Sequence, residues 1–198
     1  MDDPAIDEEE AAPRFLLGAG PARADAVAAV VAALRPAGLI VRAGWDRGLL
    51  DVVRGHGIAL LAEDDVDLAA ELDGLHLSNS SRVPDMRAAL DRTKANRLIL
   101  GVDVGLSRHD AMVAGEEGAD YVAFGQHGQS ADEKVLDLIS WWREVTVMPC
   151  LGYALDAETV EKLAGIGTEF IGVSSAVWDD PEGPEAAARK LSAAIAKS

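Results

Sequence analysis

Carboxylates without neighbouring basic residues gather at two points of the sequence where chemistry could take place. Glu63, Asp64 and Asp65 form one group, and Asp103 lies further along the chain. Carboxylate oxygens are preferred ligands of Mg²⁺, especially where a substrate phosphate completes the coordination. We therefore expect Asp64 and Asp103 to be able to share one Mg²⁺ ion. The alternative is an acidic rim on an acidic protein.

Two other side chains have the chemistry for anion binding and for proton transfer. Arg42 carries a planar set of donors that suits a phosphate or a carboxylate, so it could bind a ligand or pair with one of the acids. His127 lies in the polar segment 125–130, where an imidazole could act as acid or base near neutral pH. An exposed histidine without a role is the alternative there.

Small residues near the end of the chain indicate a phosphate site. Gly152 would let a ligand approach the backbone closely, and Ser174 and Ser175 offer hydroxyl and amide donors before a short helical turn over 175–178. Because serine is common at helix starts, a plain strand end followed by a helix cap is the alternative.

These residues share one position in an alternating pattern of strands and helices. The expected strands are 14–20, 39–44, 58–64, 74–78, 97–103, 121–125, 146–152 and 170–175. The expected helices are 22–34, 47–56, 66–72, 85–93, 108–117, 132–144, 157–164 and 184–197. Strands that are apolar on both faces are typical of parallel sheets covered by helices. Eight such units predict an α/β protein with a single (β/α)8 TIM barrel.

The barrel prediction explains why the candidate residues belong together, since ligands bind at the carboxyl ends of barrel strands. An open doubly wound sheet is the alternative, but the first strand–helix turn lacks a complete G-x-G-x-x-G because Arg23 replaces its last glycine. Pro149 fits poorly inside the strand expected at 146–152, because proline donates no ladder hydrogen bond.

Composition limits the classes of function. The chain has 198 residues and a formal net charge of -16, which opposes binding to nucleic acid or to an anionic membrane. No apolar segment approaches the roughly 20 residues that span a bilayer. The single cysteine and the lack of a signal peptide are typical of a cytoplasmic protein. Residues 1–12 are expected to form a disordered acidic tail before one barrel domain, 13–198.

Trp141 and Trp142 are adjacent in an expected helix, so they cannot both face the barrel. An exposed tryptophan among them would indicate a contact in a homodimer. The alternative is a single apolar side chain on the surface.

Four segments together resemble the thiamine phosphate synthase and TenI superfamily. They are LLAEDDVDLA at 60–69, DGLHL at 73–77, GADYVAFG at 118–125 and GVSSA at 172–176, and the likeness covers about residues 37–190. The resemblance implies a barrel independently of the strand pattern. It also implies a small phosphorylated metabolite as ligand, and a synthase that joins a hydroxymethylpyrimidine diphosphate to a thiazole phosphate with Mg²⁺ and releases pyrophosphate.

The residues that the resemblance assigns match in part. Arg42 is similar to the family's arginine after the second strand, Asp64 to its metal-binding aspartate, and Ser175 to its closing serine. The asparagine that usually precedes the aspartate is Glu63 here. The family's Gly-Gly pair after the seventh strand corresponds to Leu151 and Gly152.

Other positions depart from the family's pattern. The second metal-binding aspartate corresponds to the segment 78–81, which has no carboxylate. Asp103 replaces a serine and would supply the missing ligand. The loop after the sixth strand reads GQHGQS, and Lys134 matches that loop's lysine only with a shift of one residue.

The resemblance leaves three functions open. A synthase would use Mg²⁺ and the diphosphate substrate. A TenI-like thiazole tautomerase would need no cofactor and would use His127, one position from the family's histidine. A barrel that binds a phosphorylated ligand without catalysis is the third, and the short connection between the second and third strands favours it, since synthases carry a longer arm there.

Overall fold

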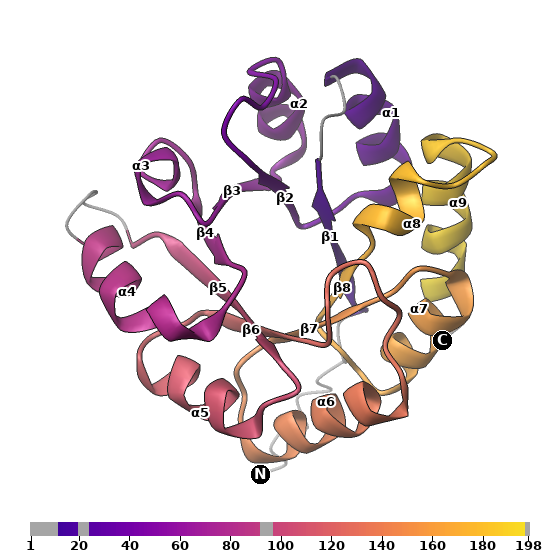
Figure 1. Ribbon diagram of the computed structural model, residues 1–198. Helices are drawn as coiled ribbons and strands as arrows, with labels where there is room; N and C mark the ends of the chain where they lie inside the picture. Colours follow the sequence, from indigo (N-terminus) through magenta and orange to yellow (C-terminus); the bar gives the residue numbers. More distant parts are fainter. Residues whose placement is uncertain (1–11, 20–23, 92–96, 197–198) are drawn as a thin grey trace, which may run out of the picture.

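The computed structural model describes residues 12–19, 24–91 and 97–196, which form a closed barrel of eight parallel strands (Figure 1). β1 pairs in parallel with both β2 and β8, which closes the sheet. The predicted single (β/α)8 barrel is confirmed, and the open sheet is excluded. The acidic tail expected at 1–12 lies, apart from its last residue, outside the described residues. The strands are β1 Arg14–Gly18, β2 Gly38–Val41, β3 Ala59–Glu63, β4 Gly74–Leu77, β5 Ile99–Gly105, β6 Tyr121–Phe124, β7 Cys150–Tyr153 and β8 Phe170–Gly172.

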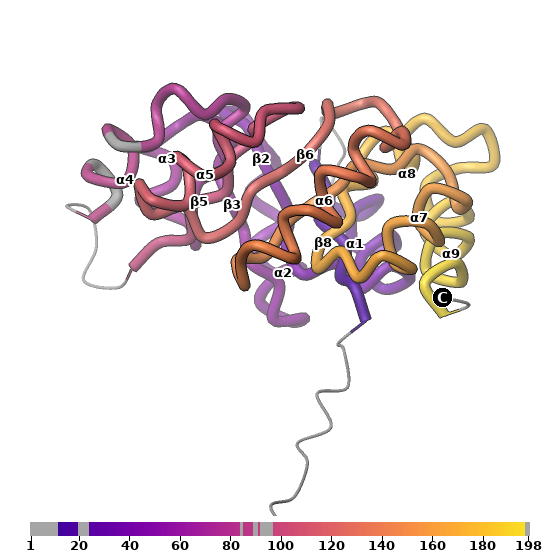
Figure 2. The backbone as a smooth tube through the Cα atoms, turned by 90° about the horizontal axis from the view of Figure 1, so that it is seen from below, coloured from indigo at the N-terminus to yellow at the C-terminus, as the bar shows by residue number. Residues whose placement is uncertain are grey.

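Helices form a ring around these strands, and α9 closes it by packing between α1 and α7 (Figures 1 and 2). A short extra helix, α8, follows β8. Aspartate or serine side chains at several helix starts accept a backbone N–H three residues further on, which satisfies a donor that the helix leaves open. The helices are α1 Ala24–Leu34, α2 Leu49–His56, α3 Val66–Ala69, the 3₁₀ turn η1 Ser80–Arg82, α4 Val83–Asp91, α5 Arg108–Glu116, α6 Glu133–Val145, α7 Ala157–Gly165, α8 Ser174–Trp178 and α9 Pro184–Ile195.

Alternation along the strands divides the core into two layers. One set of side chains packs between the strands and the helices, where Trp142 is buried. Its neighbour Trp141 is half-buried beneath the guanidinium of Arg108, whose Cζ lies 4.6 Å from the ring centroid. The other set fills the inside of the barrel and comprises Leu16, Leu61, Tyr121, Ala123, Leu151 and Tyr153.

The seventh strand corrects the prediction made from the sequence. The expected strand at 146–152 is wrong at its start, because β7 begins at Cys150, directly after Pro149. Pro149 still contributes to the sheet edge, since its carbonyl accepts the N–H of Val122 at 3.3 Å. The strand also continues to Tyr153, one residue beyond the expected end. β5 likewise extends past Asp103, which therefore lies within the strand.

Acidic residues at the starts of three alternate strands tie the sheet together. Each one directly precedes its strand and accepts a backbone N–H from the strand before it in the chain, at 2.8 to 3.0 Å. The pairs are Asp73 with Leu60, Asp120 with Leu100 and Glu169 with Cys150.

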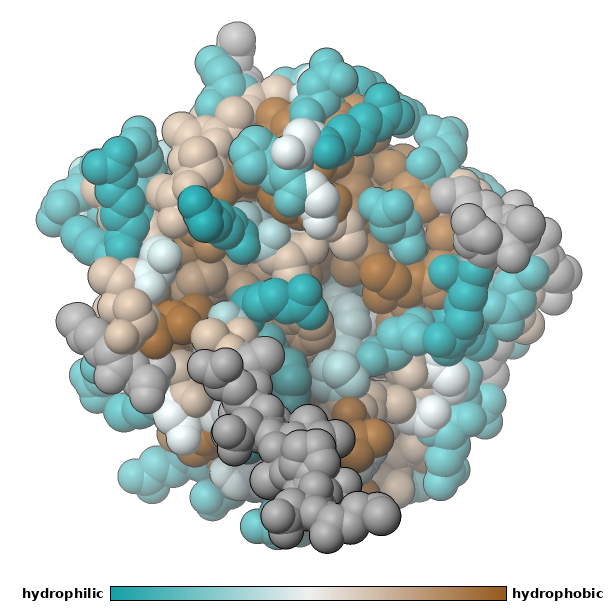
Figure 3. All heavy atoms as spheres, turned by 180° about the vertical axis from the view of Figure 1, so that it is seen from behind, coloured by the Kyte–Doolittle hydropathy of each residue, from teal (hydrophilic) through white to brown (hydrophobic). Residues whose placement is uncertain are grey.

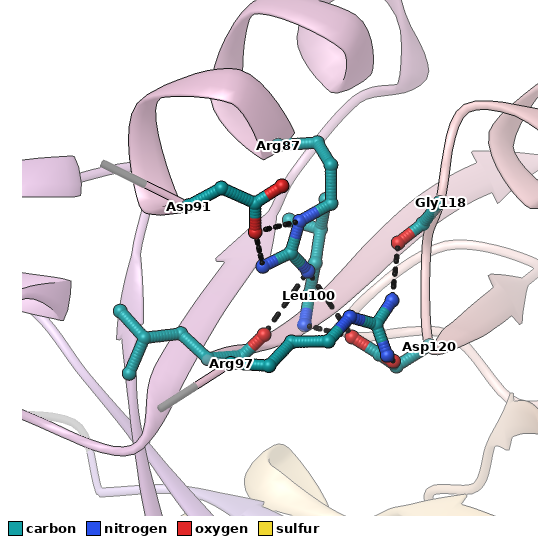
Figure 4. Close-up of polar contacts among 7 residues, drawn as sticks. Arg87, Asp91, Arg97, Leu100, Gly118 and Asp120 are labelled. Atoms are coloured by element: carbon teal, nitrogen blue, oxygen red, sulfur yellow. Dashed lines mark hydrogen bonds and ion pairs between the residues drawn. The ribbon is translucent and has the colours of Figure 1, made fainter. Parts of the chain in front are cut away.

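Asp120 also anchors a network of arginines (Figure 4). Its carboxylate accepts from Arg97 at 2.6 Å and lies 3.4 Å from the guanidinium of the buried Arg87. Arg87 reaches it from α4 and also donates to Asp91 at 2.7 Å. The network therefore fixes α4 against β5 and β6.

The face opposite to that of Figure 1 has hydrophilic and hydrophobic side chains interspersed over its coloured area (Figure 3). Within the part of the chain that the structure describes, no helix has both the length and the apolar character needed to cross a membrane.

Candidate active site

Side chains that point toward the barrel axis converge at the carboxyl ends of the strands. Glu63 follows Leu61 on the inner face of β3, and Tyr153 follows Leu151 on the inner face of β7, because alternate residues share a face. His76 from β4 and Asp103 from β5 line the same small cavity, of about 40 Å³, which we call the floor cavity.

A chain of four polar side chains crosses this floor. The hydroxyl of Tyr121 lies 2.8 Å from Nδ1 of His76, and Nε2 of His76 lies 3.4 Å from Oδ1 of Asp103. Tyr153 donates its hydroxyl to the same Oδ1 at 2.6 Å. Burial, and then the charge of Asp103, raises the pKa of Tyr153 well above its ordinary value, so this phenol remains a donor. His76 is thus a buried, hydrogen-bonded histidine at the centre of this chain of side chains.

Two glycines make room for the tyrosines of this chain. A Cβ on Gly172 of β8 would lie 2.6 Å from Cδ1 of Tyr153. A Cβ on Gly101 of β5 would collide with the ring of Tyr121. The small residues on neighbouring strands therefore fix where the two rings lie.

Arg42 and Glu63 form a two-point ion pair at the rim. Nε of Arg42 donates to Oε2 at 2.5 Å, and Nη2 donates to Oε1 at 2.6 Å. The hydrogen bond and charge of Glu63 raise the pKa of Arg42. The arginine side chain is 75% exposed, and Nη1 makes no hydrogen bond within the described residues. Arg42 thus pairs with one of the acids, which was the alternative to ligand binding, and one nitrogen remains for a ligand.

A larger hollow, the main cavity, opens above the floor cavity and has a volume of about 630 Å³. Sites for small molecules commonly have volumes of a few hundred to about a thousand Å³. Charged, hydroxyl and aromatic side chains all reach it, so it can bind a polar ring. They include Arg42, Glu63, His127, Ser174, Ser175 and Trp178.

The end of β8 is fastened to the end of β1. Oγ of Ser174 accepts the N–H of Gly18 at 2.6 Å, and the indole N–H of Trp178 donates to the carbonyl of Gly18 at 2.6 Å. Ser175 lines the main cavity from α8. The expected helical turn is confirmed, with α8 beginning one residue earlier, at Ser174.

His127 lies where a ligand could meet it. Its ring packs edge-on against Tyr153 with 5.6 Å between ring centroids, and it lines both the main and the floor cavities. The main and floor cavities together form what we call the mouth of the barrel. It is lined by Arg42, Asp103, His127, Ser174 and Ser175.

Three other candidates lie apart from these cavities. A Cβ on Gly152 would meet Leu163 and Ile139, so this glycine allows close packing against α6 and α7. Lys134 is exposed on the first turn of α6. Asp64 is exposed, and its Oδ1 accepts the N–H of Ser78 at 3.0 Å.

The carboxylates present do not form a cation site by themselves. Over residues 12–19, 24–91 and 97–196, no three His, Cys, Asp or Glu side chains are grouped so that they could hold a metal ion. Glu63 is paired with Arg42, Asp103 holds Tyr153, and Asp64 faces Ser78. The residues therefore do not fit a Mg²⁺ ion held between Asp64 and Asp103 in this arrangement.

Trp178 and Tyr153 line these cavities but are not among the candidates from the sequence. Trp178 belongs to the expected helical turn, and Tyr153 lies beyond the end of the expected strand. The alternation from Leu151 to Tyr153 was a usable signal, because it places the tyrosine inside the barrel once β7 is set to start after Pro149.

The fold and the mouth define a (β/α)8 barrel with a ligand cavity at the carboxyl ends of its strands. Residues 44–177 match the family model described as thiamine monophosphate synthase. The chain is 37% identical over 147 residues to the thiamine-phosphate synthase of Rhodospirillum centenum, covering 70% of each chain. It is 35% identical over 156 residues to that of Erythrobacter litoralis, covering 72% of this chain and 71% of the relative. This chain belongs to the thiamine monophosphate synthase family.

A solved structure supports the fold. The thiamine phosphate pyrophosphorylase from Pyrococcus furiosus superposes with a TM-score of 0.73 at 18% sequence identity, over 94% of this chain and 96% of that one.

Proposed function

We propose that this protein is a transferase of the thiamine-phosphate synthase type. It would join a hydroxymethylpyrimidine diphosphate to a thiazole phosphate and release pyrophosphate. The observation that carries the proposal is the main cavity, which has room for small phosphorylated rings and is lined by Arg42, His127 and Ser175 in a chain of this family.

The chemistry requires one bond to break and one to form. The carbon–oxygen bond to the diphosphate breaks and the leaving pyrophosphate keeps the electron pair, while the thiazole nitrogen forms a bond to the same carbon. Arg42 can donate from Nη1 to a phosphate oxygen, since its other contacts are made to Glu63. Ser175 can donate its hydroxyl to a second phosphate from α8.

Mg²⁺ remains an expectation from the family resemblance. The carboxylates of Glu63, Asp64 and Asp103 are engaged with protein groups, so we assign no step to the ion. A diphosphate can bring its own Mg²⁺ into a site, because this cation keeps several waters and often binds mainly to substrate phosphates.

The test is a coupled assay on the purified full chain with the pyrimidine diphosphate, the thiazole phosphate and Mg²⁺, following thiamine phosphate and pyrophosphate together. We expect both products, and a loss of at least about tenfold in kcat/KM for Arg42→Ala, about 1.4 kcal/mol. Arg189→Ala, which breaks an exposed ion pair on α9, is the matched control and should keep the wild-type rate. No product from folded protein would overturn the proposal.

A thiazole tautomerase is the second candidate, and the place of His127 between the main and floor cavities favours it. An imidazole at that position can move a proton on a bound ring without a metal ion. Metal-free turnover of a thiazole phosphate that is lost in His127→Asn would establish this activity. Turnover that persists in His127→Asn would exclude His127 as its base.

We also infer a cytoplasmic location and a homodimer. The single, buried and free cysteine supports the first. The second rests on the part of Trp141 that stays accessible beside Arg108, and analytical ultracentrifugation of wild type and Trp141→Ala tests it. A monomeric wild type would contradict the homodimer.

A further inference from the structure

The ring of Tyr153 crosses the mouth of the barrel from one strand to another. It starts on β7, and its hydroxyl reaches Asp103 on β5 at 2.6 Å, with β6 between these two strands. The side chain is 7% exposed, so nearly all of its surface is in contact with protein. It therefore forms part of the inner wall of the mouth.

Asp103 is held in place from its other side. Nε2 of His76 lies 3.4 Å from the oxygen that accepts from Tyr153, and His76 in turn contacts the hydroxyl of Tyr121 at 2.8 Å. The absent side chain of Gly172 leaves the space that the Tyr153 ring fills. The position of the ring thus depends on a short acceptor that is itself positioned by a buried histidine.

Two cavities meet at this ring. A lateral cavity of about 180 Å³ lies between the loop after β5 and the loop before α6, and it is lined by residues that include Leu106, Phe124, Gln126 and Tyr153. Tyr153 also lines the floor cavity, whereas the main and lateral cavities share no lining residue among those that the structure describes. The ring of Tyr153 consequently separates the lateral cavity from the mouth.

We propose that Tyr153 is a specificity-determining residue that closes the lateral cavity to ligands in the mouth, and that Asp103 is the positioning residue that holds it there. Ligands in the mouth are then confined to the main and floor cavities, and a rigid, extended ring system cannot reach into the lateral cavity. The expectation that these ligands carry a phosphate rests on the proposed function, whereas the partition by Tyr153 does not.

The effect of Asp103→Asn distinguishes this positioning role from that of a metal ligand. Asp103→Asn removes the charge but keeps an oxygen that can accept from Tyr153. Asp103→Ala removes the acceptor. A positioning residue therefore tolerates asparagine and not alanine, whereas a ligand for Mg²⁺ tolerates neither.

The first experiment tests the tether without any ligand. The chain has only two tyrosines, so ring ¹³C labelling gives two sets of signals, which Tyr153→Phe assigns. We expect the Tyr153 signals to shift in Asp103→Ala and to stay close to the wild-type position in Asp103→Asn. Unshifted signals in Asp103→Ala, in a folded protein, would overturn the positioning role.

The second experiment tests the partition by calorimetry with phenyl phosphate and 4-biphenylyl phosphate. We expect Tyr153→Ala and Asp103→Ala to raise the affinity for 4-biphenylyl phosphate relative to phenyl phosphate at least tenfold over the wild-type ratio. The ratio should stay close to that of wild type in Asp103→Asn. Tyr153→Phe keeps the ring without its hydrogen bond, so it should show a smaller rise and serves if the alanine variant does not fold.

The outcomes separate this inference from the proposed function. An unchanged ratio of the two affinities in folded Tyr153→Ala would overturn the partition while leaving a phosphate site in place. If neither phosphate binds the wild type, phosphate recognition in the mouth has failed, and the labelled-tyrosine spectra still decide whether Asp103 positions Tyr153.

Discussion

Glu63 competes with anionic ligands for Arg42, and Glu63→Gln tests this competition. The substitution removes one negative charge from the rim and weakens the two-point contact with the guanidinium. We expect the variant to bind inorganic pyrophosphate more tightly, because the freed arginine can donate to it. Stability should fall by no more than about 1 kcal/mol, since the arginine is 75% exposed.

The size of the gain follows from Coulomb's law. A phosphate on Nη1 of Arg42 would lie on the order of 6 Å from the Glu63 carboxylate, where two unit charges interact by about 0.7 kcal/mol in water and about 3 kcal/mol at an effective dielectric constant of about 20. The exposed rim favours a value between these limits. We therefore predict a gain of about 1.4 kcal/mol, or tenfold in Kd.

Isothermal titration of sodium pyrophosphate without metal, into wild type and Glu63→Gln, measures this gain. Glu71→Gln is the matched control, because Glu71 forms an exposed ion pair with Arg47 and does not line the main cavity. It changes the net charge equally and should leave the affinity close to that of wild type. Unchanged or weaker binding by Glu63→Gln, with folding intact, would refute the reasoning.

Three further predictions concern stability and pH. Asp120→Ala removes the acceptor that Arg87 and a β5 N–H share, so urea unfolding should show a loss of about 2–3 kcal/mol (Figure 4). Burial raises the pKa of Tyr121 and of Tyr153, so absorbance should show no phenolate in the folded protein at about pH 11, and stability should fall as pH rises above about 10. Burial opposes ionisation of Asp156, but hydrogen bonds at the start of α7 outweigh it and lower its pKa. Its contribution should be present above about pH 4 and lost as pH falls further, and Asp156→Asn should flatten the acid side of a stability–pH curve.

Each of these predictions has a result that contradicts it. Arg189→Ala breaks an exposed pair on α9 and should cost no more than about 0.5 kcal/mol, so an equal cost for Asp120→Ala would show that its network adds little. Phenolate absorbance in folded protein at that pH would contradict the burial of the tyrosines. An unchanged acid limb in Asp156→Asn would show that this cap does not set the acid stability.

The barrel could be predicted from the sequence because parallel strands buried on both faces leave a repeated apolar pattern. The eight strand–helix units and the family segments pointed to the same fold. The end of β7 could not be placed as well, since a strand of four residues has little pattern and Pro149 stood at its edge. Because the expected strand ended at residue 152, Tyr153 was not predicted to point into the barrel.

The sequence indicated which candidate side chains lie at the carboxyl ends of the strands better than it indicated what they contact. Placement at strand ends brought Arg42, His127 and Ser175 to the mouth as expected. The direction of a side chain depends on the local backbone, and Asp64, with φ at 54°, turns toward Ser78. The position of Asp103 in the sequence did not indicate that a tyrosine from another strand would donate a hydrogen bond to its carboxylate.

The most direct test of the central claim is a ³¹P NMR record of one reaction mixture. It would contain the purified chain, the pyrimidine diphosphate, the thiazole phosphate and Mg²⁺. The account predicts that thiamine phosphate and pyrophosphate appear in equal amounts as both substrates disappear, and that Arg42→Ala slows their appearance. Substrates that persist unchanged with folded wild-type protein would contradict the claim that this barrel is a synthase.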